Sequence, residues 1–184
     1  MEKVKALDFY KAWTNVVSEK EQELSNNWYR DTDYTKSVIS SEASVINSVS
    51  ELLGLKCYNK DYYCIDSILY LEEDFVPRKP KGSYWFKDIR VAFEHENQFG
   101  NNLFQEVSHL LITNCDLMVL VTYPHLPKEK DVMKYLHEII LSSRRAKSIS
   151  DSENFMMIFG KTDPSMWSGH IFKESGWKNL PEKL

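Results

Sequence analysis

Glu94 and Glu96 are the residues whose type and spacing first suggest chemistry. They close a mostly apolar run, Ile89 to Phe93, and only His95 separates them. Because a β-strand alternates its side chains between two faces, both carboxylates would lie on one face, about 6–7 Å apart. Like charges at that spacing repel each other and resist burial, and a divalent cation relieves both problems. The pattern therefore predicts a metal-binding site.

A third carboxylate, Asp66, lies inside another apolar and aromatic run, Tyr62 to Leu71, which predicts a strand. An unpaired carboxylate would be costly in such a run. If the two strands are neighbours, Asp66 meets Glu94 and Glu96 at one end of the sheet. Three carboxylates in an apolar frame form a hard-oxygen site suited to Mg²⁺ or Mn²⁺. Such a cation polarises a phosphoryl oxygen and activates a bound water, which is the chemistry of phosphodiester hydrolysis.

The rest of the sequence supplies the elements that must position these side chains. Apolar residues at helical spacing predict helices at about 7–24, 38–53, 101–113 and 128–146. Runs of β-branched and aromatic residues predict strands at about 62–71, 84–96, 117–123 and 155–159. The stretches 25–36 and 72–82 are expected to be connections.

The order of these elements predicts an α/β fold with a mixed central β-sheet flanked by helices. A helix separates the Glu94 strand from the strand that begins at Leu117, so those two strands should be parallel. The pair of strands before that helix should be antiparallel. Alternation also places His95 on the face opposite the two carboxylates. The C-terminal tail contains Trp167, Ile171, Phe172 and Trp177 and should pack on the domain.

Length and composition bound the class of protein. The chain has 184 residues, 42% of them hydrophobic and 27% charged, which suits one domain over residues 1–184. No apolar stretch is long enough to span a membrane, and the N-terminus lacks a secretory h-region, so we expect no membrane partner. Three cysteines without metal-like spacing, Cys57, Cys64 and Cys115, fit reduced thiols in the cytoplasm.

At this point the chain resembles the PD-(D/E)XK nuclease superfamily. The family core has an Asp on one strand, an acidic-x-acidic or acidic-x-Lys motif on the next, then a helix and an apolar strand. The matching residues are Asp66 and the segment Glu94-His95-Glu96. The resemblance implies a restriction-endonuclease-like αβββαβ-type core at about 38–160, preceded by an N-terminal helical region at about 1–54.

The resemblance also implies roles for the acidic residues. Asp66 and Glu94 would bind Mg²⁺ or Mn²⁺, with the backbone carbonyl of His95 completing the inner shell. Glu96 stands where the family usually has its catalytic Lys, a substitution that some restriction endonucleases share. Without the Lys, Glu96 is the candidate base, and a second metal is the alternative.

The sequence departs from the family pattern in two further ways. No Pro precedes Asp66, and the segment between Asp66 and Glu94 is long because it includes a Pro-rich excursion. A family helix before the first strand often adds an acidic residue, for which Glu42 and Glu51 are the options. On the helix after the motif, Gln105 and His109 are candidates to line the same cleft, although an exposed helix face explains them equally well.

Basic residues cluster just ahead of the acidic pair. They are Arg78, Lys79, Lys81, Lys87 and Arg90. In a nuclease they would hold DNA phosphates, while a solvated loop is the plainer interpretation. The net charge of −4 argues against a generally basic surface but leaves room for a local basic groove.

We therefore expect a metal-dependent endonuclease that hydrolyses DNA, and the family resemblance is compatible with a homodimer. One alternative is a catalytically inactive domain of the same fold that binds nucleic acid or protein after loss of the Lys. A further alternative is a small acidic interaction protein, because an acidic-x-acidic pair at a strand end is common on solvated edges.

Overall fold

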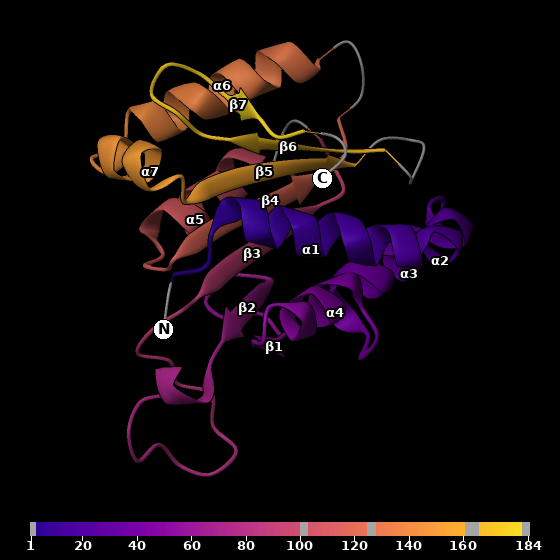
Figure 1. The fold of residues 1–184 in the computed structure, drawn as a ribbon, viewed down its shortest axis with the longest axis vertical. Coiled ribbons are helices and arrows are strands. Elements are labelled where there is room, and N and C mark those ends of the chain that lie inside the picture. Colours follow the sequence, from indigo (N-terminus) through magenta and orange to yellow (C-terminus); the bar gives the residue numbers. More distant parts are fainter. Residues whose placement is uncertain (1–2, 100–102, 125–127, 161–165, 182–184) are drawn as a thin grey trace.

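Apolar strands run through the centre of the protein and helices cover both of their faces (Figure 1). The computed structural model describes residues 3–99, 103–124, 128–160 and 166–181. Its α-helices are α1 (Ala6–Glu19), α2 (Glu21–Asn27), α3 (Asp31–Thr35), α4 (Val45–Leu52), α5 (Leu103–Ile112), α6 (Glu129–Leu141) and α7 (Ala146–Ser152). Short turns of π-helix and 3₁₀-helix, η1 (Lys36–Ser40) and η2 (Glu72–Asp74), complete the helical elements. The strands are β1 (Lys56–Tyr58), β2 (Ser67–Tyr70), β3 (Val91–Glu96), β4 (Leu117–Thr122), β5 (Phe155–Gly160), β6 (Trp167–Ile171) and β7 (Lys178–Asn179).

These strands form one open, mixed sheet whose spatial order follows the chain, from β1 to β7 (Figure 1). The central strands β3, β4 and β5 are parallel, and the pairs at both sides of them are antiparallel. Helix α5 makes the crossover from β3 to β4, which brings Glu94 opposite Leu120. The predicted α/β class, the mixed sheet and the parallel pairing of these two strands are confirmed.

Two apolar layers, one on each face of the sheet, decide which way each β3 side chain points. On one face Phe93 packs on Trp13 of α1, with ring centroids 5.7 Å apart. On the other face Ala92 belongs to a layer that includes the inner side of α5. Strict alternation then directs Glu94 toward the α5 layer and His95 toward the α1 layer, as predicted for His95.

The strand predicted at 62–71 begins later than expected. Tyr63 and Cys64 have φ angles of 53° and 67°, so the chain makes a tight turn closed by a bridge between Tyr62 and Ile65. Asp66 therefore lies directly before β2 rather than within a long strand. The strand predicted at 84–96 is likewise only β3, because the preceding residues fold back and Phe86 forms a bridge with Phe75.

Other boundaries differ where polar residues occupy helices. The expected connection at 25–36 is wrong: it contains the end of α2 and all of α3. The helix predicted at 38–53 is interrupted before Ser44, whose hydroxyl caps α4 by accepting from the N–H of Asn47. The helix predicted at 101–113 corresponds to α5, and its first two positions lie outside the described residues.

The C-terminal segment packs on the domain as predicted, but as strands. Trp167 and Ile171 are buried ends of β6, which pairs with β5. Gly169 and His170 interrupt the apolar pattern of β6, which explains why composition did not indicate a strand there. Within the described residues, no helix combines the length and apolar character needed to cross a membrane.

Candidate metal centre

Asp66 and Glu94 lie beside each other where β2 begins and β3 approaches its end. The antiparallel ladder places Ser67 opposite Phe93. Asp66, which precedes Ser67, therefore lies beside Glu94, which follows Phe93. The N–H of Asp66 donates to Oε2 of Glu94 at 3.2 Å. The N–H of His95 donates to Oδ2 of Asp66 at 2.9 Å. Two of the three predicted carboxylates are thus joined through backbone hydrogen bonds.

Helix α5 brings two further polar side chains to Glu94. Glu106 and His109 are three residues apart and so lie on one side of the helix. Nδ1 of His109 is 3.7 Å from Oε1 of Glu94 and 3.4 Å from Oε2 of Glu106. One potential ligand atom from each of the three residues lies within 4.8 Å of the other two. Together with Asp66, they form what we call the acidic cluster.

Glu94 has an unusual environment within the acidic cluster. Its side chain is 1% exposed, and Oε1 has no hydrogen-bond partner among the described residues. A buried carboxylate oxygen without a partner is costly, because its lost hydration is not replaced. A cation between Glu94, Glu106 and His109 would supply the missing partner. The donor set of carboxylate oxygens and one imidazole nitrogen suits Mn²⁺, and its oxygens suit Mg²⁺.

The carboxyl pKa values reflect this crowding. Burial raises the pKa of Glu94 well above its usual range, and the negative charges of Asp66 and Glu106 raise it further. Burial also raises the pKa of Asp66 to about 6, against the lowering effect of its hydrogen bond from the His95 backbone. In the metal-free protein, burial and the neighbouring negative charges therefore favour the protonated form of Glu94, in the place where a cation would bind.

Glu96 is half-buried at the end of β3 and follows the same face as Glu94. Its Oε1 accepts a hydrogen bond from the N–H of Gln98 at 2.6 Å, so the side chain is turned into the local loop. Among the described contacts it does not join the acidic cluster. Glu42 and Glu51 are both exposed in the layer of α4, which packs on α1 across the sheet from α5. The structure thus places both options for an extra acidic residue away from the acidic cluster.

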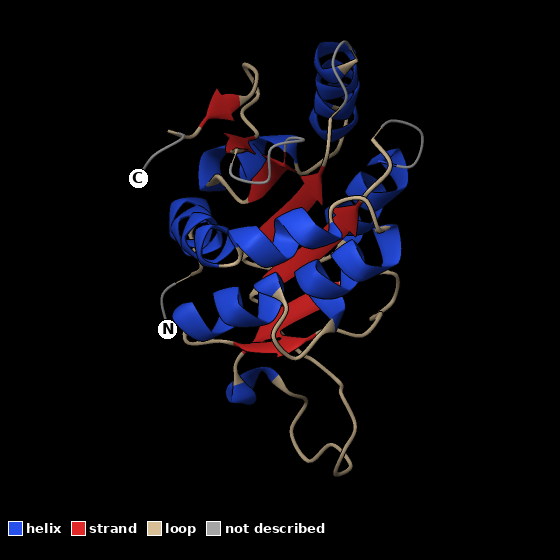
Figure 2. Ribbon diagram, turned by 90° about the vertical axis from the view of Figure 1, so that its right-hand side faces the viewer, coloured by secondary structure: helices blue, strands red, loops and turns tan. Residues whose placement is uncertain are grey.

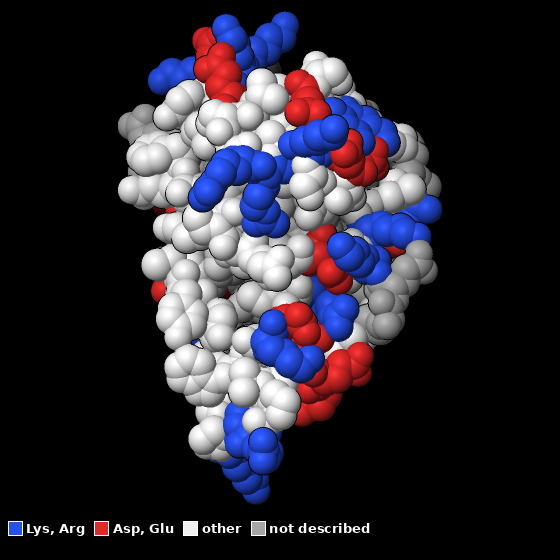
Figure 3. All heavy atoms as spheres, turned by 90° about the vertical axis from the view of Figure 1, so that its left-hand side faces the viewer, with Lys and Arg blue, Asp and Glu red and all other residues white. Residues whose placement is uncertain are grey.

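The predicted basic residues divide into two groups. Arg90 is committed to the protein, because its guanidinium makes two hydrogen bonds to Asp74, at 2.8 and 2.6 Å, and lies 3.5 Å from Asp116. The other four lie on the β2–β3 connection: Arg78, Lys81 and Lys87 are exposed, whereas Lys79 is half-buried and its ammonium donates to the carbonyl of Ser83 at 2.6 Å. Figure 3 shows Lys and Arg side chains gathered at the lower tip of the molecule, where this connection projects in Figure 1.

On the opposite face, His95 belongs to a buried aromatic group. Its Nε2 lies 2.8 Å from the hydroxyl of Tyr123, and burial lowers the pKa of His95 to about 3, so the imidazole is neutral. The hydroxyl of Tyr34 faces that of Tyr123. The Tyr34 hydroxyl nevertheless makes no hydrogen bond to any described residue. His95 therefore contributes only its backbone to the side of Asp66.

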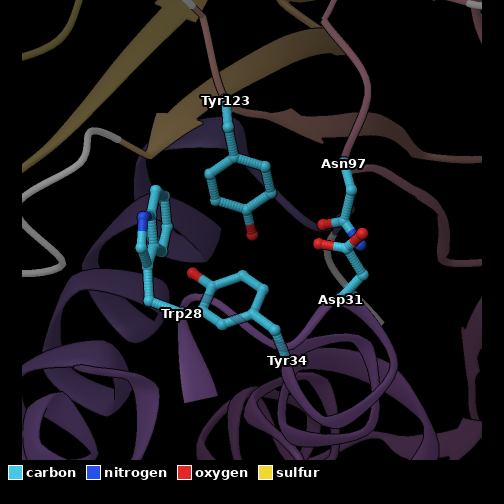
Figure 4. A pocket seen from close by; sticks show the side chains of 5 residues that line it. All are labelled: Trp28, Asp31, Tyr34, Asn97 and Tyr123. Atoms are coloured by element: carbon cyan, nitrogen blue, oxygen red, sulfur yellow. The ribbon is translucent and has the colours of Figure 1, made fainter. Parts of the chain in front are cut away.

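A pocket of about 170 Å³ opens above this aromatic group (Figure 4). Its lining comes from the N-terminal helices and the ends of β3 and β4: Trp28, Asp31, Tyr34, Asn97 and Tyr123. The two tyrosine hydroxyls point into the space between the rings. Its volume is close to that of an engineered protein cavity that accepts benzene, about 150 Å³. The pocket and the acidic cluster occupy opposite faces at the same end of β3.

The sequence pattern missed Glu106 and placed His109 only as one option. A usable signal was present, because an acidic residue and a histidine three positions apart follow the motif strand on an amphipathic helix. Gln105, the other option on that helix, is exposed. What the sequence lacked was the rotation of α5 about its axis, which the packing of Leu103, Val107 and Leu110 determines.

Comparison with known proteins adds no family to this geometry. No protein-family model matches the chain, and neither a curated protein nor a solved structure matches it at significance.

Proposed function

We propose that the protein is a divalent-cation-dependent nuclease that hydrolyses DNA phosphodiester bonds. The observation that carries the proposal is the buried, unpartnered Oε1 of Glu94, in a residue that lies within ligand-sharing distance of Glu106 and His109 and whose other oxygen accepts from the N–H of Asp66. Acidic side chains held this close favour a cation, and a cation so bound can polarise a phosphoryl oxygen and activate water.

The element order gives the proposal independent support. The segment α4-β1-β2-β3-α5-β4 follows the αβββαβ order of the restriction-endonuclease-like core. By that resemblance, Asp66, Glu94 and the backbone carbonyl of His95 would hold Mg²⁺ or Mn²⁺. Glu106 and His109 would add ligands or hold a metal-bound water from the α5 side.

Two carboxylates are candidates for the general base that activates the attacking water. Glu96 has the position of the missing Lys, but its side chain is engaged by the N–H of Gln98. Glu106 lies inside the acidic cluster. A general base must reach the attacking water within hydrogen-bond distance, so Glu106 is the better placed of the two, and Glu96 would have to release Gln98 first.

The proposal predicts metal-dependent cleavage that depends on the acidic cluster. Purified protein is incubated with plasmid, linear and single-stranded DNA, and with RNA, in EDTA, Mg²⁺ or Mn²⁺. Cleavage should require the metal and be faster with Mn²⁺, because imidazole is a better ligand for Mn²⁺ than for Mg²⁺. Asp66→Asn and Glu94→Gln should each lower the rate about 100-fold or more.

A matched control separates loss of the metal site from general damage. Glu138→Gln removes an exposed carboxylate on α6 and should leave cleavage unchanged. Circular dichroism and Mn²⁺ titration by calorimetry accompany every variant. If the wild type and both cluster variants are equally inert with all metals while folded, the catalytic proposal is wrong. The alternative, an inactive domain of this fold that binds nucleic acid or protein, would then be favoured.

A further inference from the structure

The β2–β3 connection carries a surface that the acidic cluster does not explain. Residues 76–87, which we call the arm, contain four basic residues and no acidic one. The same segment contains three consecutive aromatic residues: Tyr84, Trp85 and Phe86. The connection projects from the body of the molecule in two perpendicular views (Figures 1 and 2). A basic, aromatic projection is suited to a polyanion whose components include flat rings.

Aromatic side chains are unusually exposed on and beside the arm. Tyr84 is 44% exposed, Trp85 is 51% exposed, and Tyr63, in the turn before Asp66, is 72% exposed. Single exposed apolar residues are ordinary on a protein surface, but several large rings together mark an interaction site. These exposed rings, on and beside one basic projection, therefore form a candidate interaction surface.

Ring contacts connect the turn before Asp66 to the arm. The ring centroids of Tyr63 and Tyr62 are 4.9 Å apart, and Tyr62 lies 5.1 Å from Phe86. Phe86 contacts Tyr58 at 6.0 Å, and Tyr58 contacts Tyr84 at 4.6 Å. Tyr62, Tyr58 and Phe86 pack on the apolar layer of the α5 face, the face to which Glu94 points. A chain of ring contacts therefore leads from Tyr63, in the turn just before Asp66, to Tyr84 on the arm.

Positive charge accompanies the far end of this path. The ammonium of Lys79 lies 4.0 Å from the ring centroid of Phe75 and 5.8 Å from that of Tyr84. Arg78 and Lys81 are exposed next to it. Aromatic rings that stack on bases, beside cations that contact phosphates, are the two components of sites for single-stranded nucleic acid.

The base of the arm is fixed before any ligand arrives. Phe75 and Phe86 stack with ring centroids 5.0 Å apart, and the pair of hydrogen bonds between Arg90 and Asp74 holds the end of the connection. A pre-ordered surface loses less conformational entropy on binding than a flexible loop does. The arm is thus arranged as a platform rather than as a tether.

We propose that the arm and Tyr63 bind single-stranded nucleic acid, with unpaired bases stacked on Tyr63, Tyr84 and Trp85 and phosphates held by the basic residues. A duplex cannot use these rings, because its bases are already stacked inside the helix. The inference names a substrate class for the proposed nuclease and in that respect rests on the proposed function. Binding itself requires no metal.

The test measures binding in EDTA, so that cleavage plays no part. Fluorescence anisotropy compares a labelled oligothymidine of about 15 nucleotides, an abasic strand of equal length and a duplex at fixed salt concentration. The wild type should bind the oligothymidine most tightly. Trp85→Ala and Tyr84→Ala should each weaken that binding about 5- to 150-fold, since stacking contributes about 1–3 kcal/mol per base. Binding of the abasic strand should hardly change in these variants.

One control and one charge variant accompany these changes. Tyr135→Ala removes a ring that is 51% exposed on α6, outside the proposed surface, and should leave binding unchanged. Lys81→Gln should lower the slope of log affinity against log salt by about 0.7, as expected for the loss of one phosphate contact to a single strand.

Several results would overturn the inference. Equal binding of duplex and single strand, or equal binding of abasic strand and oligothymidine, would exclude stacking. A wild type that binds no nucleic acid would leave the exposed rings to a protein partner. Failure of the nuclease proposal looks different, because an inert enzyme can still bind oligothymidine. The opposite outcome would refute only the single-strand-binding inference. In that case Trp85→Ala cleaves duplex DNA with metal at the wild-type rate, and neither the wild type nor any variant binds a single strand.

Discussion

At the scale of single residues, Glu94 decides how the acidic cluster responds to protons and cations. Its burial among Asp66 and Glu106 makes the anion unfavourable in the metal-free protein, so a proton neutralises it. A divalent cation bound as proposed would compete with that proton for the same oxygens. Metal affinity should therefore fall as the pH is lowered.

The raised pKa values predict that the metal-free protein becomes less stable as the pH rises. The folded chain keeps protons on Asp66 and Glu94 that the unfolded chain releases above their ordinary pKa values of 3.8 and 4.5. The free energy of unfolding should therefore fall between about pH 4 and 6 through Asp66, and continue to fall above pH 6 through Glu94. Glu94→Gln should remove most of the loss above pH 6, and thermal melts in EDTA from pH 4 to 9 measure it.

Added Mn²⁺ supplies the complementary measurement. It should raise the melting temperature of the wild type at pH 8, because a ligand that binds only the folded state stabilises it, by about 2.7 kcal/mol at 100 times its dissociation constant. Glu94→Gln should show little of this gain. A wild type whose stability rises from pH 4 to 8 in EDTA would show that Glu94 is ionised and stabilised in some other way.

Individual residues also show what the sequence could indicate about the site. Strand alternation was enough to send His95 to the face opposite Glu94, because alternation is local geometry. The meeting of Asp66 with Glu94 depended in addition on the two strands being neighbours, which the ladder provides. Arg90 was grouped with the phosphate-binding residues because its partner, Asp74, lies in a different turn of the chain and no spacing rule links them. Side chains that meet only through tertiary packing have no local signature.

At the scale of elements, the β2–β3 connection depends on one ion pair. Asp74 is fully buried, and burial alone would raise its pKa, but hydrogen bonds from Arg90 and from the N–H of Leu71 outweigh that effect and lower the pKa. The contribution of Asp74 to stability is therefore present above the carboxyl's ordinary pKa and lost as the pH falls below it. This pair fixes the end of η2 to the start of β3.

Asp74→Ala should destabilise the protein by about 3–5 kcal/mol, because it leaves Arg90 without its main partner. Urea denaturation at pH 7 measures the loss. Limited proteolysis should then cut within residues 76–87 faster than in the wild type, since the anchor of the arm is gone. Lys87→Ala, which removes an exposed pair with Asp88, should change the free energy of unfolding by less than about 1 kcal/mol. Comparable losses in the two variants would contradict an anchoring role.

Elements with strong periodicity were predictable, and those that depend on their neighbours were not. The apolar runs of β4 and β5 and the amphipathic α5 lie close to their predicted positions, whereas the helix predicted at 128–146 ends at Leu141 and α7 begins at Ala146. The arm resembles a strand in composition, but Tyr84 packs beside the rings of Tyr58 and Phe75, and neither Tyr84 nor Trp85 belongs to a strand. β6 contains a glycine that composition counts against a strand, although close packing requires it there.

At the scale of the whole molecule, the N-terminal helix α1 packs on strand β6 near the other end of the chain. The hydroxyl of Tyr10 on α1 donates to the carbonyl of Trp167 on β6 at 3.1 Å. Gly169 faces the same tyrosine, and a Cβ at this glycine would lie 2.9 Å from the Tyr10 ring and 3.0 Å from Leu180. The N-terminal helix, β6 and the segment after β7 therefore pack as one unit.

Gly169→Ala should lower the stability of the whole domain by about 1–3 kcal/mol, because an extra methyl in close packing forces its neighbours apart. Urea denaturation followed by both tryptophan fluorescence and circular dichroism measures the loss. The two signals should coincide if α1 and β6 unfold with the sheet. Ser175→Ala in the exposed turn before β7 is the control and should be nearly neutral. If Gly169→Ala unfolds at the same urea concentration as the wild type, Tyr10 can move aside without loss of stability.

The turn of Tyr63 and Cys64 has a practical consequence for following the protein in solution. Cys64 is exposed, whereas burial raises the thiol pKa values of Cys57 and Cys115 to about 12. Thiolates are the reactive form, so a maleimide at neutral pH should attach selectively at Cys64. A spin label or fluorophore there would sit two positions from Asp66 and next to Tyr63. One native cysteine thus offers a reporter for both a paramagnetic cation and an arriving polynucleotide, without any engineered attachment point.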